Sequence, residues 1–160
     1  MSATNDFPEA RWWGSLVTFS PVSELPPESF AAVVVFAIHP KGFALADIPN
    51  RGWCVPSGRP EPGETPVETA VRETAEEVGG VLQDPRLIGV YTIRDDVGST
   101  RFVPAFVGRV DALGPLPPGT ESRGARIVRH EELPGIYWLW DDLMARMFDF
   151  ALEQWNRASQ

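Results

Sequence analysis

The sequence predicts an α/β fold in which a mixed β-sheet lies between helices, an α/β/α arrangement. Short apolar or alternating segments typical of strands precede and follow a capped helix, and a second amphipathic helix is expected from about residue 138 or 141 to 155. The 160 residues, 43% of them hydrophobic, suffice for one core. We therefore expect a single domain over residues 1–160, with residues 1–30 as an N-terminal extension.

The N-terminal extension is interrupted by Pro8, Pro21 and the pair Pro26–Pro27. Residues 11–19 could form a strand within it. Trp12 and Trp13 have three interpretations, in order of preference: they cover the core, they pack in a homodimer, or they stack on a base.

A continuous β-branched and aromatic segment at 31–38 predicts a buried strand, and the turn at 39–42 joins it to a hairpin partner at 43–47. A second turn is expected at 50–52. The strand predicted at 53–56 then leads into a glycine-containing loop and the first helix.

The first helix has clear end signals. Thr65 is a suitable N-cap, Pro66 suits the first helical position, and Glu68 completes a Thr-x-x-Glu capping box. Gly79 and Gly80 are expected to end the helix.

After this helix, Asp84 and Pro85 predict a turn, and residues 87–93 and 101–110 predict a hairpin. Pro104 within the second strand indicates an edge position or a bulge. Residues 125–129 are expected to form a short strand.

Three carboxylates, Glu73, Glu76 and Glu77, lie on one arc of the first helix, near its C-terminus. A solvated acidic face is the ordinary interpretation of such a cluster, but that face usually alternates acidic with basic residues, and this helix offers only Arg72. The imbalance predicts a bound cation, and oxygen ligands suit Mg²⁺, or Mn²⁺ as a substitute.

The formal net charge of −8 argues against non-specific nucleic-acid binding, although a small phosphorylated substrate remains compatible with it. No segment is typical of a signal peptide or a membrane helix, so we expect no membrane partner and a cytoplasmic location. Cys54 is the only cysteine, which excludes an internal disulfide, and its apolar neighbours favour a core position.

The segment from residue 58 to residue 80 resembles the signature motif of the Nudix hydrolases. Seven motif residues stand in register, namely Gly58, Glu64, Arg72, Glu73, Glu76, Glu77 and Gly79. Thr74 and Gly80 depart from it, since the family has aliphatic residues there. The resemblance implies the Nudix fold.

The resemblance also implies roles for individual residues. Metal ligands would come from Glu73, Glu76, Glu77 and the backbone carbonyl of Ser57. Arg72 would hold Glu73 in place, Glu64 would anchor the loop against the helix, and Gly58 and Gly79 would be structural.

Three further candidates lie in loops or at strand ends. Glu121 is a candidate metal ligand or general base by analogy with an extra loop glutamate in Nudix enzymes, and whether it or Glu73 is the base stays open. Arg94, Arg101 and Arg123 are candidate phosphate contacts.

The resemblance implies Mg²⁺-dependent hydrolysis of the pyrophosphate bond in a nucleoside diphosphate linked to another moiety. One alternative is a non-catalytic nucleotide-binding regulatory module, although no motif carboxylate is missing. A Nudix-fold isomerase of prenyl diphosphates would need an active-site cysteine, and the apolar context of Cys54 argues against that.

Overall fold

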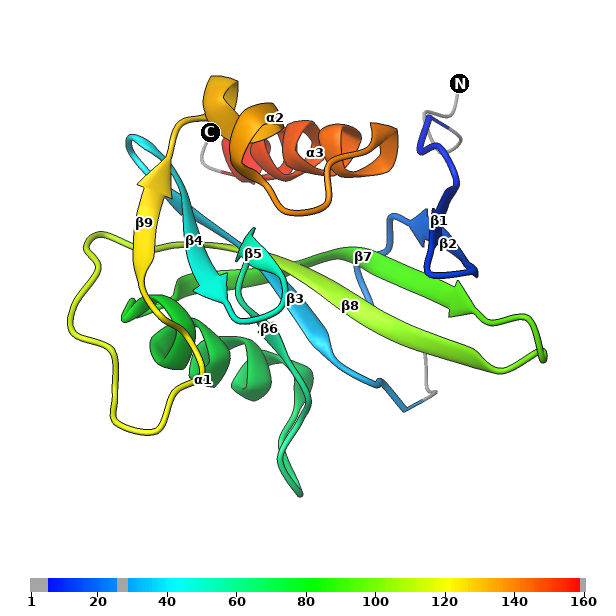
Figure 1. Cartoon of the computed structure of the whole chain (residues 1–160), viewed down its shortest axis with the longest axis horizontal. Helices are drawn as coiled ribbons and strands as arrows, with labels where there is room; N and C mark the ends of the chain where they lie inside the picture. Colours follow the sequence, from blue (N-terminus) through cyan, green and yellow to red (C-terminus); the bar gives the residue numbers. More distant parts are fainter. Residues whose placement is uncertain (1–5, 26–28, 159–160) are drawn as a thin grey trace.

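A mixed β-sheet lies at the centre of this computed structural model, which describes residues 6–25 and 29–158 (Figure 1). The strands are β1 Ala10–Trp12, β2 Ser15–Ser20, β3 Val33–His39, β4 Gly42–Ile48, β5 Gly52–Cys54, β6 Ser57–Gly58, β7 Gln83–Arg94, β8 Thr100–Arg109 and β9 Ala125–Val128. Their order is β1-β2-β7-β8-β3-β4-β5, while β6 pairs with β3 and β9 with β4. The pairing of β3 with β8 is parallel and the other ladders are antiparallel, so the sheet is mixed as predicted.

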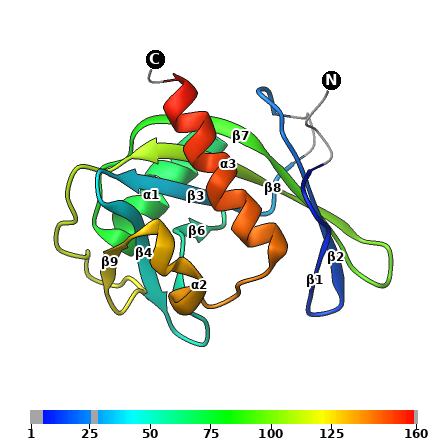
Figure 2. The same cartoon turned by 90° about the horizontal axis from the view of Figure 1, so that it is seen from above.

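Helices cover both faces of the sheet. Helix α1 (Pro66–Val78) lies on one face; α2 (Leu133–Ile136) and α3 (Asp142–Ala158) lie on the other, after the short 3-10 helix η1 (His130–Glu132). Viewed from above, α3 runs diagonally across the sheet (Figure 2). None of the helices in the described part of the chain is long and apolar enough to cross a membrane. The predicted α/β/α fold is confirmed.

The core between α3 and the sheet is aromatic. Phe148 of α3 meets Phe36 of β3 and Phe43 of β4 edge to face, with ring centroids 5.1 and 4.7 Å apart. All three side chains are buried. Such T-shaped pairs add to the free energy gained by burying the rings, so they fix α3 on the strands that precede the Nudix-like segment.

Helix α1 forms where its end signals predict. The Thr65 hydroxyl accepts a hydrogen bond from the Glu68 N–H at 3.2 Å, and the Glu68 carboxylate accepts one from the Thr65 N–H at 2.8 Å. Gly79 caps the C-terminus with a left-handed backbone, at φ 68°. The buried hydroxyl of Thr74 donates to the Ala70 carbonyl at 2.8 Å, which satisfies the polar group that departs from the family pattern.

The N-terminal segment is a hairpin, whereas one strand over 11–19 was predicted. β1 and β2 pair through Trp12 and Ser15, and the two residues between them, Trp13 and Gly14, have φ of 51° and 83°. Two positive φ values are typical of a two-residue hairpin turn. Pro26 and Pro27 lie outside the described residues.

The turn predicted at Asp84 and Pro85 is wrong, because both residues lie inside β7. Asp84 adopts φ 53°, and the pairing of β7 with β8 shifts register between Gln83 and Arg86, so the turn-forming residues make a bulge. Of the two alternatives for Pro104, the edge position is wrong, since β8 lies between β7 and β3. The β7–β8 pairing does shift register between Leu87 and Gly89, next to the pair of Val90 with Pro104. β6, η1 and α2 were not predicted.

Candidate active site

A cavity of about 690 Å³ lies between α1, the loop after β5 and the loop before β9. We call it the acidic cavity. Its carboxylate lining comprises Glu61, Glu73, Glu76, Glu77 and Glu121. The structure thus brings Glu121 to the helix carboxylates although it lies more than 40 residues farther along the chain.

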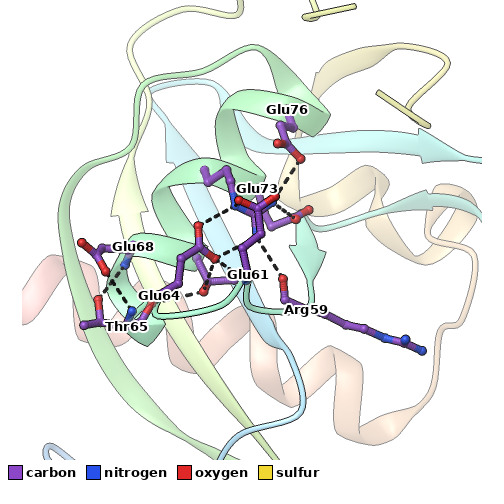
Figure 3. A network of polar contacts seen from close by, with 9 residues as sticks. Arg59, Glu61, Glu64, Thr65, Glu68, Glu73 and Glu76 are labelled. Atoms are coloured by element: carbon purple, nitrogen blue, oxygen red, sulfur yellow. Dashed lines mark hydrogen bonds and ion pairs between the residues drawn. The ribbon is translucent and has the colours of Figure 1, made fainter. Parts of the chain in front are cut away.

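Arg72 is the basic residue of α1, and its guanidinium lies among these glutamates. Nε and Nη2 donate to the two carboxylate oxygens of Glu64 at 2.6 and 2.9 Å. Nη1 donates to Glu73 at 2.6 Å and to Glu76 at 3.2 Å, while Nη2 also reaches the Arg59 carbonyl at 2.9 Å (Figure 3). The planar fork of donors ties the loop to the helix in a way that a lysine could not reproduce.

Gly58, in β6, allows a close approach to the Glu73 side chain of α1. A β-carbon at residue 58 would overlap the carboxyl group of Glu73. The loop is held on its other side by the Ser57 N–H, which donates to Glu77 at 2.9 Å. Glycine is required at position 58 because a side chain would displace Glu73 from the cavity wall.

Burial raises the pKa values of two carboxylates in the acidic cavity, Glu73 and Glu77. Glu77 is only 4% exposed, and loss of hydration raises its pKa to about 8. The hydrogen bond from Ser57 lowers this pKa, whereas the charges of Glu73 and Glu121 raise it further. Burial also raises the pKa of Glu73, although Arg72 opposes the shift. Concentrated, incompletely neutralised carboxylates of this kind mark functional sites.

The donor chemistry of the acidic cavity fits a hard divalent cation. In the described part of the chain, no group of three or more His, Cys, Asp or Glu side chains is arranged to hold a metal directly. Glu73 and Glu76 contact Arg72 instead, and Glu77 contacts Ser57. Their oxygens, with Glu121 and Ser57 in the same cavity lining, are nevertheless ligands of the type that Mg²⁺ prefers.

A second cavity, of about 630 Å³, adjoins the first and shares Ala32, Arg51 and Ser57 with it. We call it the aromatic cavity after five of its lining residues, Trp12, Trp13, Tyr91, Tyr137 and Trp138.

The three candidate phosphate contacts are dispersed. Arg101 lines the aromatic cavity, whereas Arg94 and Arg123 line neither cavity, and Arg123 lies 3.6 Å from Asp47 instead. Arg51, which lines both cavities, was missed because it stands in a turn that sequence alone cannot orient. The only indication in the sequence that Arg51 lies near the site was its position just before the strand that leads to the motif.

Cys54 lines the aromatic cavity but is 3% exposed. Burial raises the pKa of its thiol to about 12, and the negative charge of Glu77 adds to the shift. A thiol held protonated is a poor nucleophile or acid–base group at neutral pH, which argues against the isomerase alternative.

The NUDIX domain family model matches residues 29–148. No curated protein sequence matches the chain. Among solved structures, a mutant of the Bacillus subtilis pyrophosphohydrolase BsRppH is similar with a TM-score of 0.74 and 19% identity, covering 94% of this chain and 97% of that one.

Two further solved structures resemble the chain at lower TM-scores. The MutT protein from Bacillus halodurans has a TM-score of 0.59 and 21% identity over 75% of this chain and 81% of that one. A C. elegans Ap4A hydrolase has a TM-score of 0.52 and 18% identity over 80% and 98%. At these identities the structures establish the fold, and the family match covers most of the chain. The predicted resemblance is confirmed: the chain belongs to the NUDIX domain family.

Proposed function

We propose that this Nudix hydrolase cleaves the pyrophosphate bond of a nucleoside diphosphate linked to another moiety, with Mg²⁺ as cofactor and Mn²⁺ as a substitute. Among the similar structures, one is named a pyrophosphohydrolase and another an Ap4A hydrolase, which supports this class of reaction.

One observation carries the proposal: four motif and loop carboxylates, Glu73, Glu76, Glu77 and Glu121, line one open cavity. Arg72 offsets part of their charge. An anionic substrate would be repelled from this cavity by the remaining charge. A divalent cation held by these oxygens removes the repulsion and, when bound, acidifies water and polarises the phosphoryl oxygens.

Glu121 is the better placed of the two candidate bases. Its carboxylate is exposed in the cavity and makes no hydrogen bond or ion pair with a described residue. Glu73, in contrast, accepts a hydrogen bond from Arg72 at 2.6 Å. A carboxylate that is free to accept a proton from water suits a general base, so we assign that role to Glu121 and a ligand or orienting role to Glu73.

Arg72 acts as a positioning residue in this account. Its contacts with Glu64, Glu73 and the Arg59 carbonyl keep the loop and the carboxylates in one arrangement. Small displacements of positioned groups cost much of a catalytic rate. The substrate phosphates are expected near Arg51, at the junction of the two cavities, and the exposed Arg101 lines the aromatic cavity.

The test is turnover of a panel of nucleotide pyrophosphates, measured with Mg²⁺ and again with excess chelator. The panel should include dinucleoside polyphosphates, nucleoside diphosphate sugars and nucleoside triphosphates. We expect at least one compound to be cleaved at its phosphoanhydride bond, with the rate lost in chelator and restored by added Mg²⁺.

Binding of these compounds without turnover of any of them would instead indicate a non-catalytic nucleotide-binding module. Turnover that survives the chelator would contradict the metal assignment.

A further inference from the structure

Trp13 is the most unusual residue of the aromatic cavity, because its side chain is 76% exposed at the cavity lining. Its indole ring stacks on Trp138, with centroids 5.3 Å apart and planes 21° from parallel. The indole N–H forms no hydrogen bond with a described residue. Trp13 and Trp138 together form a contiguous aromatic surface in the cavity lining, and exposed apolar patches of this kind mark binding sites.

The backbone at Trp13 is also unusual. Its φ of 51° lies in the left-handed region, where a bulky side chain is rare and costs free energy. Asn or Gly would occupy this hairpin position without that cost. A tryptophan that is both exposed and held at a strained φ contributes little to folding beyond its stack on Trp138, which favours a role in binding.

The rest of the cavity wall is held in place by hydrogen bonds. Trp12 Nε1 donates to Asp141 at 2.8 Å, and the Tyr137 hydroxyl accepts from the Val55 N–H at 3.2 Å. The backbone N–H of Trp138 donates to the Trp53 carbonyl at 3.0 Å. Trp13 therefore faces a preformed aromatic wall, and preorganised walls favour binding of rigid planar groups.

Arg51 marks the boundary with the acidic cavity. It forms no ion pair with a described residue, although the chain carries a formal net charge of −8 and Arg51 lines the acidic cavity beside Glu77. The Arg51 side chain interacts with the buried Cys54 thiol and, electrostatically, with Glu77. A guanidinium that no ion pair with a described residue neutralises, and that lies between an aromatic cavity and a metal-suited cavity, fits a phosphate group. A ligand that satisfies both sides has a planar aromatic part joined to an anionic part.

We infer that the aromatic cavity binds the base of the substrate nucleotide, with Trp13 stacking on the base and Arg51 contacting the adjoining phosphate. This inference rests on the proposed function and specifies its substrate as one whose base enters from the β1–β2 hairpin side. The hairpin lies outside the residues 29–148 that match the family model, whereas the similarity to the BsRppH structure covers 94% of the chain.

The inference is tested by calorimetric binding of AMP, GMP and ribose 5-phosphate to the full chain in chelator, where no hydrolysis occurs. Loss of one stacking partner weakens base binding by roughly 5- to 150-fold, and we expect that loss for AMP and GMP in Trp13→Ala. Trp13→Phe should restore most of the affinity. Ribose 5-phosphate should bind wild type and Trp13→Ala equally.

Two controls separate stacking from other effects. Val97→Ala removes another highly exposed apolar side chain, at 81% exposure in the β7–β8 loop, and should leave AMP binding unchanged. Trp13→Asn suits a positive φ, so its melting temperature should equal or exceed that of wild type while AMP affinity falls. A structural role for Trp13 would instead lower the melting temperature of this variant.

Several results would overturn the inference. One is equal AMP affinity in wild type and Trp13→Ala, and another is the absence of AMP and GMP binding to wild type. A third is that Trp13→Ala loses as much affinity for ribose 5-phosphate as it loses for AMP. Dissociation of a homodimer by Trp13→Ala, with AMP affinity unchanged, would assign Trp13 to self-association. Trp13-dependent AMP binding without any pyrophosphate turnover in Mg²⁺ would support the base site and refute the proposed hydrolysis.

Discussion

Arg72 and Glu64 form a two-pronged ion pair across eight residues of sequence, with Nε–Oε2 and Nη2–Oε1 distances of 2.6 and 2.9 Å. Glu64 also accepts hydrogen bonds from the Glu61 N–H at 2.8 Å and the Thr69 hydroxyl at 2.9 Å. One carboxylate thus joins the loop before α1 to two turns of the helix. The same guanidinium then reaches Glu73, so the loop and the candidate metal ligands share one network.

Glu64→Gln should weaken the dependence of protein stability on pH below about pH 4.5. The hydrogen bonds from Arg72 lower the pKa of Glu64 from 4.5 to about 2. Because the folded-state pKa is depressed, the stabilisation is fully present above pH 4.5 and is lost as the pH falls toward 2. Melting temperatures recorded between pH 2.5 and 6 should fall less steeply with acid in Glu64→Gln than in wild type.

The control for this profile is Glu24→Gln, because the exposed Glu24 makes no hydrogen bond or ion pair with a described residue. Its melting temperatures should fall with acid as steeply as those of wild type. If the melting temperatures of wild type and Glu64→Gln fell equally steeply with acid, the ion pair of Glu64 with Arg72 would not stabilise the fold.

Thr74→Val should be neutral or stabilising. The Thr74 hydroxyl is fully buried and serves only the Ala70 carbonyl, which the helix backbone already satisfies. A lost hydrogen bond of this kind costs about 0.5–1.5 kcal/mol, and the added methyl group offsets it. Chemical denaturation measures the difference, and a loss greater than about 1.5 kcal/mol would reveal another role for the hydroxyl.

Thr69→Val is the matched comparison, since Thr69 is equally buried but its hydroxyl also donates to Glu64. We expect it to be less stable than Thr74→Val, because it removes one hydrogen bond from a carboxylate.

Glu121→Gln should lower kcat by about 10²–10⁴ with little change in KM. The amide retains the shape of the side chain but cannot accept the proton from water. Steady-state kinetics with Mg²⁺ and the best compound of the panel make the measurement, with the exposed Glu131→Gln as control. Full activity in Glu121→Gln together with loss of activity in Glu73→Gln would move the base to Glu73.

Local sequence signals predicted α1 and most of the motif geometry. Thr65, Glu68 and Gly79 act within one turn of the helix, so their roles can be read from neighbouring residues. The same holds for Thr74, whose hydrogen-bond partner lies four residues back. Glu121 could be proposed only through the family resemblance, because its nearness to α1 depends on the whole sheet.

The features that sequence reasoning missed depend on distant contacts or on rare backbone conformations. Tryptophan rarely adopts a positive φ, so the sequence around Trp13 predicted one continuous strand where the structure has a hairpin. Asp84 and Pro85 are residue types typical of a turn, but in the structure they form a bulge within β7, where it pairs with β8. Arg51 gains its importance from two cavities that form only when β4, β5 and α1 pack together.

The most direct test of the account is Glu77→Gln, compared with wild type for Mg²⁺-dependent turnover and for melting temperature with and without Mg²⁺. Glu77 is 4% exposed and has a pKa raised to about 8 by burial, so a neutral amide should leave the metal-free protein at least as stable.

We predict that Glu77→Gln folds normally in chelator, loses the rise in melting temperature that millimolar Mg²⁺ gives wild type, and loses about 10²–10³ in kcat. Near wild-type turnover in Mg²⁺, with the same Mg²⁺-induced rise in melting temperature, would contradict the assignment of the acidic cavity as the metal-dependent active site.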